Sequence, residues 1–85
     1  MDSVRKDTRI GSYVMGVRYD YNDCKYKILI ALNRWEDNPA FLENTYFAKG
    51  LNKSVFDSVE EADYFFDIVF EKIADWENYK INNRK

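Results

Sequence analysis

The chain has 85 residues, of which 46% are hydrophobic and 18% aromatic, and a formal net charge of −2 with one Cys and no His. This length allows one domain, and the aromatic residues provide enough apolar surface for a core. A single Cys excludes an intramolecular disulfide, and the lack of His excludes histidine bases, His-containing metal sites and His-based triads. No apolar run approaches the roughly 20 residues that cross a bilayer, so we expect a cytoplasmic protein without membrane contact.

The two ends of the chain are polar. Residues 1–11 are predicted to form an N-terminal arm with three basic residues. Residues 12–81 are predicted to form a single domain, and residues 82–85 a basic tail.

Two segments with alternating polarity predict an antiparallel hairpin. Hydrophobic and polar residues alternate over residues 12–21 and again over residues 25–33, which is typical of β-strands. Residues 22–23 are predicted to form the turn between them. We expect the face with Ile28 and Ile30 to pack on a helix, and the opposite face to be open to solvent or to a partner.

The segment after the hairpin is predicted to hold one further strand. Residues 34–44 are interpreted as a connector in which Pro39 could open a short helical turn. Residues 45–49 are predicted to form the third strand, and residues 54–56 a short extended piece.

The most regular pattern predicts a long C-terminal helix. Ser58 and Glu61 have the spacing of a capping box, and no Gly or Pro interrupts the chain from there to about Tyr79. Apolar residues at three- and four-residue spacing predict one core-facing stripe: Ala62, Phe65, Phe66, Val69, Ile73 and Trp76. The expected fold is therefore α+β, with a two-layer arrangement of a three-stranded antiparallel sheet packed on one long helix.

The outer face of this helix is predicted to be acidic. Residues 56–79 contain eight acidic residues and one Lys, a net charge of −7. Carboxylates four residues apart lie about 6 Å apart along a helix axis, which is close to the phosphate repeat of a nucleic-acid strand. Apolar side chains among them would anchor a partner. The predicted partner-binding residues are Glu60, Asp63, Tyr64, Asp67, Ile68, Glu71 and Asp75.

Motifs for catalysis and cofactor binding are missing from the sequence. One Cys cannot form a thiolate zinc site, and there is neither a phosphate-binding Gly-rich loop nor a dinucleotide fingerprint. Cys24, beside a turn, is interpreted as an ordinary free thiol. We expect a protein that is not an enzyme, with no catalytic residue, metal, cofactor or small-molecule substrate.

One resemblance points to DNA binding. Residues 16–18 (Gly-Val-Arg), the strand at residues 25–33 and residues 56–62 (Phe-Asp-Ser-Val-Glu-Glu-Ala) resemble the AP2 DNA-binding domain of plants and apicomplexans and the related arm-binding domain of phage integrases. The resemblance spans roughly residues 14–70 and implies that the open sheet face contacts DNA. The DNA-binding residues of this alternative are Arg18, Lys27 and Lys49.

A second resemblance is one of type and transfers no residues. Small, acidic, aromatic-rich proteins with few His resemble phage anti-defence proteins, anti-CRISPR proteins among them, several of which carry an acidic face that imitates nucleic acid. This resemblance implies a non-enzymatic inhibitor that binds a basic nucleic-acid site on a host protein complex through the acidic helix face.

Two further interpretations remain open. The chain could be a protein-interaction module or homodimer that packs through Val14, Leu29 and Ala31, because apolar residues in the middle of a sheet face fit a protein contact. The carboxylates of the helix could also form an ordinary solvated face, which many soluble domains have.

Overall fold

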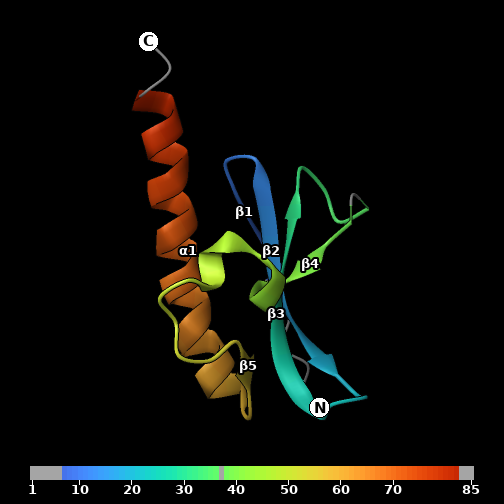
Figure 1. Cartoon of the computed structure of the whole chain (residues 1–85). Helices are drawn as coiled ribbons and strands as arrows, with labels where there is room; N and C mark the ends of the chain where they lie inside the picture. The colour runs from blue at the N-terminus through green and yellow to red at the C-terminus, as the bar shows by residue number, and fades with distance from the viewer. Residues whose placement is uncertain (1–6, 37, 83–85) are drawn as a thin grey trace.

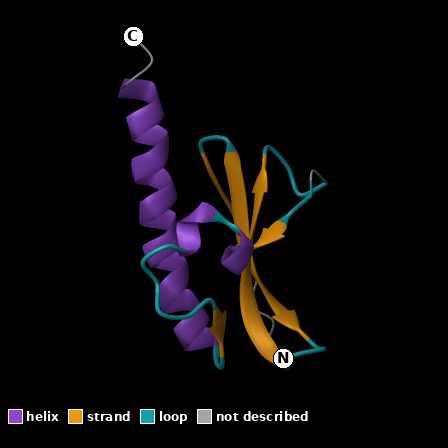
Figure 2. Cartoon of the chain, in the orientation of Figure 1, coloured by secondary structure: helices purple, strands orange, loops and turns teal. Residues whose placement is uncertain are grey.

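A computed structural model of the protein describes residues 7–36 and 38–82 as a two-layer α+β domain, with a sheet on one side and a single long helix on the other (Figures 1 and 2). The strands are β1 (Thr8–Ile10), β2 (Tyr13–Asp20), β3 (Lys25–Leu32), β4 (Ala40–Phe41) and β5 (Val55–Phe56). Two short 3₁₀ helices, η1 (Leu42–Asn44) and η2 (Tyr46–Ala48), lie between β4 and β5, and the helix α1 (Val59–Asn82) follows. The α+β class and the long C-terminal helix are as predicted.

The sheet is antiparallel, and β2 and β3 form the predicted hairpin. β1 pairs with β2, and β2 pairs with β3 over the full length of both strands. The other edge of β3 is shared by two short strands: β4 lies beside Leu29 and Ile30, and β5 beside Tyr26 and Lys27. The prediction of three strands is therefore wrong, because segments of two or three residues carry no alternation that a sequence pattern could reveal.

β1 lies within the predicted polar N-terminal arm. Gly11 and Ser12 form a two-residue turn into β2, and Gly11 has a φ of +58°, which the mirror-image turns of hairpins require. The turn places Ile10 against the core, where the residue is 8% exposed. Residues 1–6 of the predicted arm and residues 83–85 of the predicted tail lie outside the described residues.

The third strand predicted at residues 45–49 is wrong, since this segment forms η2. Thr45 donates from its hydroxyl to the carbonyl of Leu42 (2.8 Å), and its backbone N–H donates to the same carbonyl (2.9 Å). Such local bonds compete with strand pairing, and β4 and β5 already occupy the edge of β3. The helical turn expected at Pro39 begins later, at Leu42.

The start of α1 follows from its cap. The backbone N–H of Glu61 donates to the hydroxyl of Ser58 at 3.1 Å, as predicted. The second bond of the predicted capping box differs by one residue, because the Glu61 carboxylate accepts from the N–H of Asp57 at 2.9 Å and not from that of Ser58. The other carboxylate oxygen of Glu61 pairs with Lys53, so the cap also fixes the loop before the helix.

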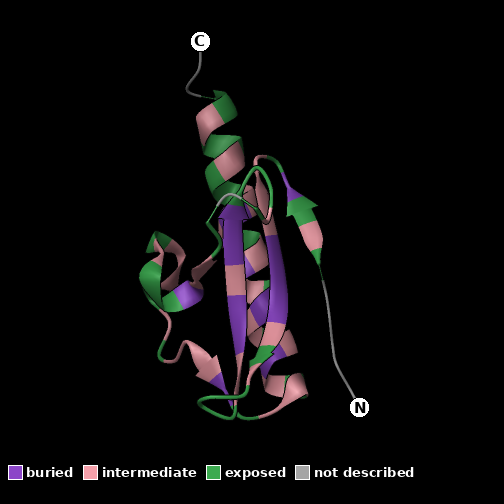
Figure 3. Cartoon of the chain, turned by 90° about the vertical axis from the view of Figure 1, so that its right-hand side faces the viewer, coloured by how far each residue is buried: buried purple, intermediate pink, exposed green. Residues whose placement is uncertain are grey.

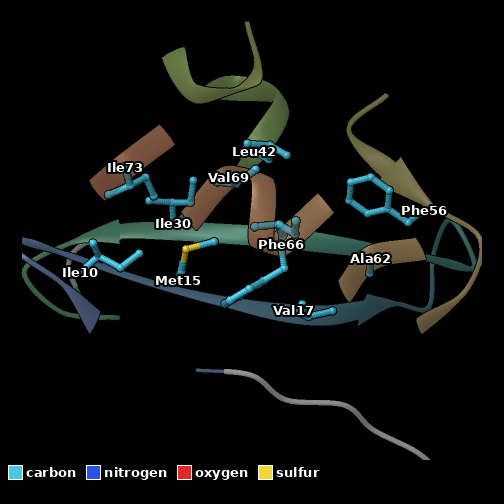
Figure 4. Close-up of a cluster of buried hydrophobic side chains, with 11 residues drawn as sticks. Ile10, Met15, Val17, Ile30, Leu42, Phe56, Ala62, Phe66, Val69 and Ile73 are labelled. Carbon is cyan, nitrogen blue, oxygen red and sulfur yellow. The ribbon is translucent and has the colours of Figure 1, made fainter. Parts of the chain in front are cut away.

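The core lies between α1 and the near face of the sheet (Figure 4). The predicted packing of this face on the helix stripe is confirmed, with most of the core residues fully buried: Met15, Val17, Ile28, Ile30, Leu42, Phe56, Ala62, Phe66, Val69 and Ile73. Two stripe residues differ from the prediction. Phe65 is half-buried and stacks on Phe56, with ring centroids 5.0 Å apart. Trp76 is 40% exposed, because the last turns of α1 extend past the end of the sheet (Figure 1).

Candidate interaction site

The acidic row consists of Glu60, Asp63, Asp67, Glu71 and Asp75, all on α1 and away from the core. Asp63 is half-buried, and the other four are exposed. From Asp63 on, the members are four residues apart. Because four residues turn a helix by about 400°, each of these steps shifts the row by about 40° around the axis, and the row from Glu60 to Asp75 spans about 22 Å along it. The row therefore winds from the β1 side of the helix at Asp67, beside Thr8, toward the η2 side at Asp75.

Two apolar side chains that were predicted to anchor a partner lie beside this row. Tyr64 is 65% exposed, and its ring meets that of Phe65 edge-on at 5.3 Å. Ile68, one turn further along, is half-buried. The outer face of α1 thus has the mixture of carboxylates and apolar groups that the sequence predicted.

Five basic side chains of the domain are paired with acidic residues outside the acidic row. The ion pairs are Arg18 with Asp7, Lys25 with Asp57, Lys27 with Asp20 and Asp23, Lys53 with Glu61, and Lys80 with Glu77. The nearby lysine lowers the pKa of Asp20, Asp57, Glu61 and Glu77 below the ordinary range, because its ammonium group favours the charged form of each carboxyl. Glu60, Glu71 and Asp75, by contrast, form no ion pair within residues 7–36 and 38–82.

The far face of the sheet was expected to be open, and this expectation is wrong. Ala31 and Gly16 are buried on it, and the Trp35 ring lies 3.2 Å from where a Cβ on Gly16 would be. Figure 3, which views this side, shows buried residues in the middle of β2 and β3. The segment after β3 folds back and covers the strands, and the apolar contact surface predicted at Val14, Leu29 and Ala31 is half-buried or buried.

Lys27 and Arg18, the two strand residues of the DNA-binding alternative, form ion pairs within the protein. The Lys27 ammonium lies 2.7 Å from Asp20 and 2.6 Å from Asp23, its side chain is 8% exposed, and these two carboxylates raise its pKa. Arg18 lies 2.8 Å from Asp7, and its guanidinium is 5.1 Å from the centre of the Trp35 ring. Lys49 is exposed but lies directly after η2, not on the sheet.

Sequence reasoning missed a groove between the C-terminal half of α1 and the β2–β3–η2 side of the domain. The groove has a volume of about 980 Å³, which is at the upper end of the range for ligand-binding clefts. Five of its thirteen lining residues are aromatic: Tyr13, Tyr46, Phe47, Trp76 and Tyr79. The charged residues of the lining are Lys49, Lys72 and Asp75, the last member of the acidic row. The signal in the sequence was the Trp76-Tyr79 spacing, which was interpreted only as the end of the core stripe and of the helix.

The described residues show no arrangement suited to metal binding, since no group of three or more Asp, Glu and Cys side chains converges among them. Cys24 is exposed at the β2–β3 turn. Of the part of the chain that the structure describes, no helix is long and apolar enough to cross a membrane. Comparison of the chain with protein families, curated proteins and solved structures finds no match.

Proposed function

We propose that the protein is a non-enzymatic inhibitor of a nucleic-acid-targeting complex in the host cytoplasm, of the anti-CRISPR type. In this proposal the acidic row binds a basic nucleic-acid site on the partner, and Tyr64 and Ile68 pack at its side. The partner is thus a protein complex, and the chain needs neither a cofactor nor a small-molecule substrate.

One observation carries this proposal: three carboxylates on the outer face of α1 have no ion pair among the described residues. Six acidic residues off the row pair with lysine or arginine, whereas these three, Glu60, Glu71 and Asp75, do not. Glu36 and Glu43 also form no ion pair among the described residues, but they are not part of a helical row. Carboxylates four residues apart on a helix repel one another by a few tenths of a kcal/mol. A basic surface would relieve this repulsion and gain charge-assisted hydrogen bonds.

The spacing of the row supports nucleic acid as the natural ligand of the site that it would occupy. Its members lie about 6 Å apart along the helix, close to the phosphate spacing of one strand. A nucleic-acid site that binds consecutive phosphates would therefore present cations at intervals that the row can meet. The DNA-binding alternative lacks such support, because Arg18 and Lys27 already have carboxylate partners.

A competition experiment tests this function. A purified RNA-guided nuclease and a restriction endonuclease are each bound to a labelled DNA duplex, and displacement by the chain is followed by fluorescence anisotropy. We expect the chain to displace the duplex from at least one of these two nucleases. The double variant Asp67→Lys with Glu71→Lys should weaken displacement about 5- to 30-fold, from two lost charge pairs at about 0.5–1 kcal/mol each.

The matched control changes the same number of charges away from α1. Glu36 and Glu43 are both exposed and lie in the β3–β4 connection and in η1. The double variant Glu36→Lys with Glu43→Lys should displace the duplex as the unaltered chain does. Equal losses in the two double variants, or no displacement from either nuclease, would contradict the proposed function.

A further inference from the structure

Several aromatic residues of the groove are exposed. On the α1 side Trp76 and Tyr79 stack with ring centroids 5.7 Å apart and planes at 20°. On the other side η2 contributes Tyr46, which is 77% exposed, and Phe47, which meets the Tyr13 ring edge-on at 5.6 Å. Exposed aromatic surface gathered in one concave region marks a binding site rather than ordinary surface.

Lysine ammonium groups of the same chain lie over some of these rings. The Lys80 ammonium lies 5.6 Å from the Tyr13 ring centre and 5.8 Å from that of Trp76, and that of Lys49 lies 5.7 Å from Tyr46. Both distances to the Lys80 charge are within the range of cation–π attraction. The ring faces of the groove are therefore suited to positive charge, and they extend beyond what Lys80 covers, since Tyr79 is 58% exposed.

One carboxylate in the groove lining is available to a ligand. Asp75 is exposed and forms no ion pair within the described ranges. The nearest lysine along the helix, Lys72, directs its ammonium to the carbonyl of Lys49 at 3.0 Å. A carboxylate beside exposed ring faces is the combination that recognises a planar cation, because the rings attract its face and the carboxylate accepts from its edge.

We propose that the groove binds an arginine side chain of the partner, with the guanidinium stacked on Trp76 and Tyr79 and paired with Asp75. The inference rests on the proposed function, since it names the residue that a basic site would insert at this end of the acidic row. Arginine is preferred to lysine because its planar fork both stacks on rings and bonds a carboxylate through two N–H groups. Lys49 and Lys72 also line the groove, so nucleic acid is the competing occupant that the test includes.

The test compares N-acetylated hexa-arginine and hexa-lysine amides by isothermal titration and by NMR of the tryptophan indole N–H groups. The two indole signals are assigned with Trp35→Phe. We expect hexa-arginine to bind about tenfold more tightly, a preference of about 1.4 kcal/mol, and to shift the Trp76 indole signal more than that of Trp35. Asp75→Asn and Tyr79→Leu, both at exposed positions, should each reduce the preference to about twofold or less.

Glu60→Gln serves as the matched control, since it removes one charge at the other end of the acidic row. It should weaken both peptides equally and leave the preference for arginine unchanged. Equal binding of the two peptides to the unaltered chain would overturn the arginine inference and leave the proposed function standing. Binding of neither peptide would overturn both. Tight binding of oligothymidine that Lys49→Gln weakens would replace arginine with nucleic acid as the occupant.

Discussion

The far face of the sheet and the outer face of α1 both looked like binding surfaces in the sequence, and the structure treats them in opposite ways. On the sheet, Lys27 is 8% exposed and bound to two carboxylates. On the helix, Glu60 and Glu71 are exposed and form no ion pair among the described residues. A charged residue is available to a partner only where the fold has not already neutralised it, and composition alone cannot show that.

The register of the hairpin explains the difference. Arg18 and Lys27 lie directly opposite each other on β2 and β3, and like charges in that position destabilise a sheet. Each cation therefore has its own acidic partner, Asp7 for Arg18 and Asp20 with Asp23 for Lys27. On α1, Glu60, Glu71 and Asp75 have no such partner among the described residues, and like charges one helical turn apart on an exposed face cost only a few tenths of a kcal/mol.

The largest expected effect is on stability and comes from the hydrophobic core between α1 and the sheet, which supports both surfaces. Ile73 is fully buried between α1 and the sheet, and Ile73→Ala should lower the free energy of unfolding by about 2–5 kcal/mol. Urea unfolding followed by far-ultraviolet circular dichroism measures it. Ile81 is 62% exposed on the last turn, and Ile81→Ala should change stability by no more than about 0.5 kcal/mol. Similar losses in the two variants would mean that the helix end is packed as tightly as its middle.

The periodic parts of this chain were predictable, and its short-range parts were not. The apolar stripe with a 3.6-residue period predicted α1. The cap at Ser58 was predicted correctly because it depends only on one hydroxyl and one backbone N–H. The two alternating segments gave the hairpin. In contrast, two features decided that the segment at Thr45 forms a 3₁₀ helix and not a strand. Its hydroxyl donates to the Leu42 carbonyl, and β4 and β5 already pair with the edge of β3.

The candidate site divides in the same way. The acidic row was predictable because it depends only on helix periodicity, which α1 obeys from Glu60 to Asp75. The aromatic groove was not, since Tyr46 and Trp76 are far apart in sequence and meet only through tertiary packing. Nor could alternation show that Trp35 would return over Gly16 and cover the far face.

The two tryptophans sharpen the comparison, since each lies on one of the regions. Trp35→Ala should destabilise the protein by about 1–2 kcal/mol, because the ring covers Gly16 and stacks near Arg18. Trp76→Ala, at the exposed groove, should cost less than about 1 kcal/mol. Hexa-arginine binding should show the reverse order, with loss in Trp76→Ala and none in Trp35→Ala. Thermal unfolding and isothermal titration measure the two; an unchanged Trp35→Ala melting temperature would mean that the far face is open.

The smallest expected effect concerns the joint between the groove and the sheet. The Glu77 side chain is 14% exposed, lies 2.9 Å from the Lys80 ammonium and accepts from the N–H of Ser12 at 3.2 Å. The lysine above all holds the pKa of Glu77 below its ordinary value of 4.5. A carboxyl with a lowered pKa in the folded state stabilises the fold at a pH above its ordinary pKa. This contribution is lost as the pH falls through the lower pKa of the folded state.

The melting temperature of the unaltered protein should therefore fall as the pH drops below about 4.5, and Glu77→Gln should make that fall shallower. Lys80→Met should flatten the profile in the same direction, because it removes the partner that lowers the pKa of Glu77. Parallel profiles for the three proteins would show that Glu77 does not fasten α1 to the turn before β2. In that case α1, which carries both the acidic row and one wall of the groove, would be held to the sheet by its buried stripe of Ala62, Phe66, Val69 and Ile73.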